Sequence, residues 1–215
     1  MLQLPAKITQ RRCEERLIPL MRNFGQKLVI CVCGMVGCGK STLAKKLAEK
    51  YRFKYLSGGN ALKTLAIEIG YKPGGMDWWE TQDGTKFLEQ RMNETKFDMR
   101  VDKKLIELTE QGNVVLDSWT MPWLLNEGFK MWLEASPKVR AERIAQRDSI
   151  SFERAFKVLN ARDEKTEVIY KRLYGFNIGK DFSPFNIILD ANELDADEVF
   201  HVICMIIDRL YIKKI

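Results

Sequence analysis

The chain alternates short apolar runs with longer stretches in which apolar residues recur every three or four positions. The runs at 28–33, 114–117 and 186–190 are rich in Val, Ile and Leu, and such runs are typical of buried strands. Shorter runs at 52–56 and 129–133 predict two more strands. The sequence therefore predicts a five-stranded sheet that is covered on both faces.

The stretches between these runs have the 3.6-residue period of amphipathic helices. The predicted helices span 42–50, 61–69, 85–111, 138–147 and 195–210. Strands that alternate with helices form parallel sheets with helices on both faces, so we expect a three-layer α/β/α domain. In such domains the ligand binds beyond the carboxyl ends of the strands.

Length, charge and cysteine content set limits on this domain. The 215 residues, 46% of them hydrophobic, suffice for one full core with one small mobile appendage. The 35 Lys and Arg against 29 Asp and Glu give a net charge of +6, which suits a polyanionic ligand but is also common in nucleic-acid-binding proteins. The 5 cysteines lack the spacing of a zinc site, so we expect reduced thiols and a cytoplasmic protein.

The N-terminal segment carries no recognisable targeting signal. It lacks the apolar core of a signal peptide, and no run in the chain approaches the roughly 20 apolar residues that a membrane-spanning helix requires. Residues 1–26 contain Arg11, Arg12, Arg16 and Arg22. We expect a basic extension that forms a docked or frayed helix, with a partner-binding arm as the alternative.

A glycine-rich motif directly after the first predicted strand carries the chemistry. Residues 34–41 match G-x-x-x-x-G-K-[ST] and precede an amphipathic helix. In this context the glycines let the backbone wrap a polyphosphate, and the helix N-terminus adds partial positive charge. Lys40 would reach the β- and γ-phosphates of ATP, and Ser41 would bind Mg²⁺. The predicted nucleotide-binding residues are Gly34, Met35, Val36, Gly37, Cys38, Gly39, Lys40, Ser41 and Thr42.

A phosphate loop of this kind requires a carboxylate at the end of a neighbouring strand, where it holds Mg²⁺, usually through water. Asp117 ends the apolar run 114–116 and is the candidate for this role. The alternative is an ordinary turn residue. Cys38, inside the loop, is either an oxidation-sensitive thiol or a small residue without a chemical role.

Several stretches resemble nucleoside monophosphate kinases, and most of the chain resembles archaeal-type cytidylate kinases. One is the phosphate loop, and another, 57–63, stands where these enzymes carry a Ser-x-Gly-Asp-x-x-Arg acceptor motif. The stretches 139–148, 174–178 and 181–186 resemble the archaeal enzymes most closely.

This resemblance implies a P-loop kinase domain at 27–215, with an acceptor-binding segment at 57–112 and a mobile lid at 148–175. It implies transfer of a phosphoryl group from ATP, with Mg²⁺, to a small phosphorylated acceptor, CMP or dCMP. A monomer or weak dimer without a membrane or nucleic-acid partner is expected.

The resemblance also implies roles for several arginines. Arg143 and Arg147, one helical turn apart, would hold the adenine and the phosphates of the donor. Arg162 and Arg172, in the lid, would reach the transferring phosphoryl group, because a guanidinium stays charged and binds phosphate oxygens bidentately. The predicted catalytic residues are thus Lys40, Asp117, Arg147, Arg162 and Arg172. The alternative is that these arginines form the solvated face of a charged helical pair.

The acceptor side departs from the family pattern. Asn60 replaces the Asp of the motif, Lys63 replaces its phosphate-clamping Arg, and 117–123 lacks the glycine-arginine pair that supplies a second arginine. A lysine neutralises a phosphate without gripping it bidentately, so the clamp is weakened. The acceptor-binding residues implied by the resemblance are Ser57, Gly59, Asn60, Lys63, Arg91, Asp98, Arg100 and Asp102. For Arg91 and Arg100, with the two aspartates, the alternative is a charged helix surface.

Tryptophans gather in the two segments expected to wall the acceptor cavity, at Trp78, Trp79, Trp119 and Trp123. An indole face stacks on a base of any sequence. We therefore expect Trp119 or Trp78 to hold the acceptor base, with a place in the core or in an oligomer interface as the alternative.

Three functions remain open at this point. The first is an ATP-dependent kinase of CMP or dCMP. The second is a kinase of the same fold that acts on another nucleotide or a small metabolite. The third is a nucleotide-gated binding protein with little turnover that uses its basic arm on RNA. Acceptor-dependent release of ADP separates the first two from the third.

Overall fold

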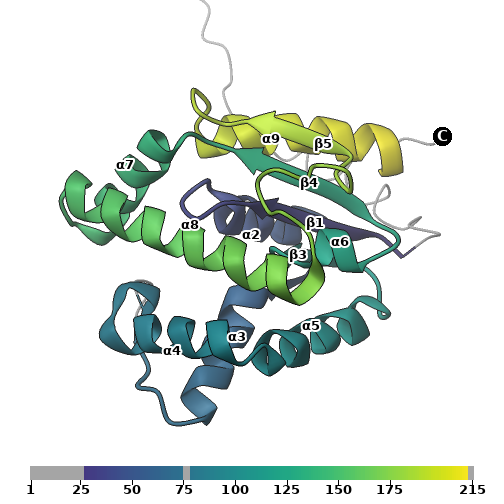
Figure 1. The fold of residues 1–215 in the computed structure, drawn as a ribbon. Helices are drawn as coiled ribbons and strands as arrows, with labels where there is room; N and C mark the ends of the chain where they lie inside the picture. The colour runs from purple at the N-terminus through teal and green to yellow at the C-terminus, as the bar shows by residue number, and fades with distance from the viewer. Residues whose placement is uncertain (1–26, 75–77, 213–215) are drawn as a thin grey trace, which may run out of the picture.

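The computed structural model describes residues 27–74 and 78–212. A parallel sheet with the strand order β2-β3-β1-β4-β5 lies at its centre (Figure 1). The strands are β1 (Val29–Gly34), β2 (Lys54–Ser57), β3 (Val114–Asp117), β4 (Phe129–Glu134) and β5 (Ile187–Asp190). The predicted five-stranded parallel sheet is confirmed, and the basic extension at 1–26 lies outside the described residues.

Helices cover both faces of this sheet (Figure 1). They are α2 (Lys40–Tyr51), α3 (Gly58–Glu68), α4 (Gln82–Asn93), α5 (Lys96–Thr109), α6 (Met121–Leu124), α7 (Pro137–Asp148), α8 (Phe152–Tyr174) and α9 (Ala196–Ile207), with short turns η2 (Trp78–Glu80) and η3 (Asp208–Ile212). Ile30 and Val32 of β1 pack toward α2 and α9. Cys31 packs toward α3 and α5, and Cys33 toward α8. Successive residues of β1 thus pack on opposite faces of the sheet, as expected for a buried parallel strand.

The strand register brings the predicted site residues to one edge of the sheet. Asp117 of β3 pairs with Val32 of β1 on one side and with Ser57 of β2 on the other. Gly34, the first residue of the phosphate-loop motif, ends β1 opposite Leu133 of β4. Because all strands run the same way, their carboxyl ends meet beside the loop.

The single helix predicted over 85–111 is wrong, because the chain forms two helices, α4 and α5, separated at Glu94 and Thr95. Glu94 has an extended backbone with φ −125° and ψ 90°. The turn brings Arg91 of α4 against Asp98 of α5, so a tertiary contact spans the break. Neither Gly nor Pro marks this turn, and periodicity alone therefore did not reveal it.

Other helix boundaries also differ from the prediction. Helix α3 begins at Gly58 rather than at residue 61, since the Ser57 hydroxyl caps it by accepting the backbone N–H of Asn60 at 3.3 Å. The arginine-rich span after α7 is one continuous helix, α8, which Ser151 caps and which ends at Gly175 in the left-handed conformation. Among the helices of the described ranges, none is long and apolar enough to cross a membrane.

Candidate active site

The phosphate loop connects β1 to α2 and leaves no room for a side chain at Gly34 or Gly37. A Cβ on Gly34, at φ +147°, would lie 2.5 Å from the carbonyl oxygen of Leu133. A Cβ on Gly37, at φ +79°, would lie 2.8 Å from the carbonyl oxygen of Arg140. Helix α2 begins directly after the loop, at Lys40, so its N-terminal amides face the space above the sheet edge.

Asp117 lies beside the start of α2. Its Oδ2 accepts the hydroxyl of Ser41 at 2.6 Å and the hydroxyl of Tyr55 at 3.1 Å. Burial, followed by the charge of Asp117, raises the pKa of Tyr55, which therefore stays a hydroxyl donor. Tyr55 was not among the predicted site residues, although its place two residues before Ser57 on β2 puts it on the same face of the strand.

These oxygens fit a Mg²⁺ site. Mg²⁺ takes one or two protein oxygens and completes its shell with water and substrate phosphates, so Ser41 and Asp117 suffice. No group of three or more His, Cys, Asp or Glu side chains that could hold a metal is found in the described ranges. Cys38 is 2% exposed, and burial raises the pKa of its thiol. This burial favours the interpretation of Cys38 as a small structural residue.

Four arginines were predicted for the donor site and the lid. Three of them line the cavity above the loop: Arg143, Arg147 and Arg162. Arg143 donates to the carbonyl oxygen of Cys38 at 3.2 Å, and Arg147 forms a bidentate pair with Asp148. The guanidinium of Arg162 lies 5.2 Å from the ring centroid of Trp79.

Arg172 and Arg100 do not line that cavity. Arg172 donates instead to the carbonyl oxygen of Met92 at 2.9 Å, and Arg100 lies on an exposed surface 3.7 Å from Glu68. Arg172 lies ten residues after Arg162 on one straight helix, which separates the two side chains by about 15 Å along the axis. Arg162 thus borders the cavity whereas Arg172 and Arg100 do not, and their roles in the site stay predictions.

Arg140 is a buried arginine that sequence analysis did not select. It donates to the carbonyl oxygens of Ala135 and Val36 at 3.0 and 3.1 Å and to Asp163 of α8 at 2.8 Å. Its side chain thus joins the phosphate loop to the predicted lid helix. In the sequence it is one of several arginines on α7, and only burial distinguishes it from the others.

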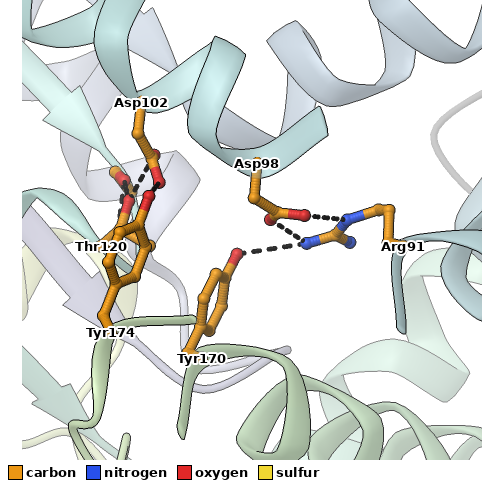
Figure 2. Close-up of polar contacts among 7 residues, drawn as sticks. Arg91, Asp98, Asp102, Thr120, Tyr170 and Tyr174 are labelled. Atoms are coloured by element: carbon orange, nitrogen blue, oxygen red, sulfur yellow. Dashed lines mark hydrogen bonds and ion pairs between the residues drawn. The ribbon is translucent and has the colours of Figure 1, made fainter. Parts of the chain in front are cut away.

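On the acceptor side, buried polar side chains from separate segments meet (Figure 2). Arg91 donates to both oxygens of Asp98, at 3.1 and 2.6 Å, and to the hydroxyl of Tyr170 at 3.3 Å. Asp102 accepts the hydroxyl of Thr120 at 2.6 Å and that of Tyr174 at 2.5 Å. The alternative that Arg91, Asp98 and Asp102 form a charged helix surface is wrong, since all three are buried.

Burial sets the protonation of this network. Loss of hydration raises the pKa of Asp102 to about 6, although the two hydroxyl donors lower it. Burial also raises the pKa of Tyr170 and that of Tyr174, so both phenols remain protonated donors at neutral pH. Tyr170, Tyr174 and Thr120 carried no recognisable sequence signal, because Tyr170 and Tyr174 reach Arg91 and Asp102 from α8, and Thr120 reaches Asp102 from the turn after β3.

The phosphate loop and the buried acceptor-side network border one shared cavity of about 820 Å³. The predicted site residues that line it are Val36, Gly37, Gly39, Lys40, Ser41, Thr42, Ser57, Gly59, Asn60, Lys63, Arg91, Asp98, Asp102, Asp117, Trp119, Arg143, Arg147 and Arg162. Gly34 and Met35 do not line it, and the carbonyl oxygen of Met35 accepts the backbone N–H of Cys38 at 3.3 Å. A smaller cavity of about 110 Å³ lies beside Arg143 and is lined by Cys38 and Leu194, among others.

The tryptophans divide between the cavity and the core. Trp79 and Trp119 line the cavity. Trp78 is 1% exposed and packs in the core with Phe87, whereas Trp123 stacks on Phe176 at 4.1 Å between ring centroids. The core alternative therefore describes Trp78 and Trp123.

Comparison of the sequence with known proteins shows the family to which this chain belongs. Residues 29–193 match the profile of the cytidylate kinase-like family. A cytidylate kinase of Pyrococcus horikoshii is 36% identical over 185 residues, 86% of this chain and 90% of that enzyme. One of Methanocaldococcus jannaschii is 31% identical over 188 residues, 85% of this chain and 99% of that enzyme.

A solved structure agrees at the level of the fold. The shikimate kinase of Acinetobacter baumannii in complex with shikimate matches with a TM-score of 0.53 at 17% identity, and the match covers 90% of this chain and 99% of that one. The phosphate loop, the parallel sheet and the family profile agree. The chain therefore belongs to the cytidylate kinase-like family.

Proposed function

We propose that this protein transfers the γ-phosphoryl group of ATP to a pyrimidine nucleoside monophosphate, CMP or dCMP. One observation carries the proposal: a single cavity of about 820 Å³ is lined by the phosphate loop and by the buried pair of Arg91 and Asp98. Phosphoryl transfer requires that donor and acceptor share one space with their reacting oxygens in line. The name of the two archaeal relatives, cytidylate kinase, supports the choice of acceptor.

On the donor side, the loop amides and Lys40 would hold the β- and γ-phosphates. Mg²⁺, held by Ser41 and Asp117, would neutralise charge on these oxygens when bound. Arg147 and Arg162 line the same cavity, and their guanidinium groups would meet the charge that spreads over the equatorial oxygens in the transition state.

On the acceptor side, a pyrimidine base offers hydrogen-bond donors and acceptors in fixed places. The Asp98 carboxylate accepts, the Arg91 guanidinium donates, and each residue is only 2% exposed. An acceptor that fails to match such a pair leaves buried charged groups unsatisfied, and this penalty discriminates strongly. Lys63 would neutralise the acceptor phosphate. Its ammonium now donates to the carbonyl oxygen of Gly74 at 2.5 Å.

The test is a coupled ADP-release assay with ATP and Mg²⁺ over all nucleoside monophosphates, with shikimate as a non-nucleotide comparison. We expect the highest kcat/KM with CMP or dCMP and loss of turnover when the metal is chelated. A higher kcat/KM with another acceptor would replace CMP in the proposal. Absence of acceptor-dependent ADP release would favour a nucleotide-gated binding protein.

A further inference from the structure

Trp119 is fixed against the strand end from which the phosphate loop starts. Its indole Nε1 donates to the carbonyl oxygen of Gly34 at 2.7 Å, and its own carbonyl accepts the thiol of Cys33 at 3.7 Å. Tyr170 of α8 packs edge-on against the ring, with 6.0 Å between ring centroids. The orientation of the indole is therefore set by β1 on one side and by α8 on the other.

The ammonium group of Lys40 lies over this ring. Its Nζ is 5.3 Å from the ring centroid of Trp119 and donates to the carbonyl oxygen of Met35 at 3.3 Å. Both partners are uncharged. A carboxylate in their place would cancel the positive charge that a polyphosphate requires, whereas an aromatic face attracts the ammonium and leaves that charge in place.

We propose that Trp119 is a positioning residue that holds Lys40 for phosphoryl transfer, in place of stacking on the acceptor base. The inference rests on the proposed function only in that ATP is the phosphoryl donor, and it is independent of the acceptor. The indole N–H is bonded to Gly34, and the indole face is in contact with Lys40. The other cavity tryptophan, Trp79, lies 5.7 Å from the guanidinium of Arg91, on the acceptor side.

The physical gain is preorganisation. A lysine side chain has many rotamers, and the enzyme loses that freedom when the ammonium is fixed on the transferring phosphoryl group. A ring that holds the ammonium beforehand reduces the reorganisation required in the transition state, where electrostatic stabilisation matters most. Loss of the ring should therefore lower kcat more than it raises the KM of the acceptor.

The first experiment measures kcat and the KM values of ATP and CMP for Trp119→Leu, which removes the aromatic face, and Trp119→Phe, which keeps one. Trp123→Leu is the matched control, since Trp123 stacks on Phe176 and donates to Asp181 without contacting Lys40. We expect Trp119→Leu to lower kcat about 3- to 30-fold with the KM of CMP nearly unchanged. Trp119→Phe should retain most of kcat, and Trp123→Leu should change it less than twofold. A raised KM of CMP at unchanged kcat would overturn the inference in favour of base stacking.

The second experiment is a double-mutant cycle on the Kd of ATP, measured without any acceptor, for Trp119→Leu, Lys40→Ala and the double variant. We expect Trp119→Leu to have no further effect in the Lys40→Ala background, because its contribution acts through that ammonium. Effects that multiply would overturn the inference. If Trp119→Leu does not fold, the same cycle with Trp119→Met, which also removes the aromatic face, decides, and absence of coupling to Lys40 is the contrary result. If wild-type protein shows no acceptor-dependent ADP release, the proposed function fails while this cycle still decides the role of Trp119.

Discussion

In the donor half of the cavity, one stretch, residues 34–42, supplies the backbone amides and Lys40, whereas Asp117, Arg147 and Arg162 come from elsewhere in the chain. In the acceptor half, the polar side chains come from α4, α5, α8 and the turn after β3 (Figure 2). A phosphate group is bound by amides that a short glycine motif can supply, whereas a base is recognised by side chains held at fixed distances. The two halves therefore place different demands on the sequence.

The halves also differ in how charge is balanced. Lys40 contacts a carbonyl oxygen and an indole, both neutral, so its charge remains available to an anionic ligand. Arg91 is already paired with Asp98, and both are buried. An anionic donor brings the compensating charge with it, but a neutral base does not, so a buried cation beside the base requires its own counter-ion.

Substitutions in the donor half should abolish turnover with every acceptor. We expect Lys40→Ala to lower kcat about 10³-fold, and Asp117→Asn to do the same, because one removes charge from the phosphate site and the other weakens Mg²⁺ positioning. Coupled ADP release measures the loss, and an unchanged near-ultraviolet circular dichroism spectrum excludes unfolding. Near-native turnover of Lys40→Ala would contradict the kinase proposal.

The lid arginines should behave unequally. Arg162 lines the cavity, and Arg172 bonds to the Met92 carbonyl away from it. Arg162→Ala is expected to lower kcat about 10²-fold with little change in the Kd of ATP, since its phosphate contact forms in the transition state. Arg172→Ala serves as the matched control and should change kcat less than threefold. Equal losses in the two variants would show that α8 moves much further on closure than this geometry implies.

Breaking the buried pair should affect both stability and acceptor choice. Asp98→Asn leaves the Arg91 guanidinium buried without a counter-ion and is expected to cost about 3–5 kcal/mol of unfolding free energy. The double variant Arg91→Met/Asp98→Leu should recover much of that stability in urea unfolding while kcat/KM for CMP stays low. The Kd of ATP should be unchanged in both, because the pair lies in the acceptor half. A double variant that still prefers CMP would show that other groups recognise the base.

The smallest expected effect concerns the pH dependence of stability. The pKa of Asp102 is raised from 3.8 to about 6, so the folded state binds its proton more tightly than the unfolded state does. Its contribution to stability is complete below about pH 4 and is lost as the pH rises through 6. Urea unfolding should therefore show Asp102→Asn gaining up to about 3 kcal/mol relative to wild type between pH 4 and pH 7. A difference that does not vary with pH would contradict the raised pKa.

The apolar pattern predicted the sheet, and the glycine motif predicted the phosphate loop. Apolar runs of β-branched residues predicted the strands, and a contiguous motif predicted the loop, because its glycine positions and the start of α2 depend on neighbouring residues only. Asp117 was also identified, since the end of a strand beside the loop is a position that the fold fixes. Neighbouring residues sufficed for the prediction wherever backbone amides are expected to bind the ligand.

Tertiary structure alone decided the acceptor side. The pair of Arg91 with Asp98 spans the turn between α4 and α5, and the hydroxyls of Tyr170 and Tyr174 reach Arg91 and Asp102 from α8. The tertiary structure also places Trp119 at the cavity and Trp78 in the core. The physical reason is that these contacts join residues up to 79 positions apart, and helical periodicity specifies which face of a helix is apolar but not which partner that face meets.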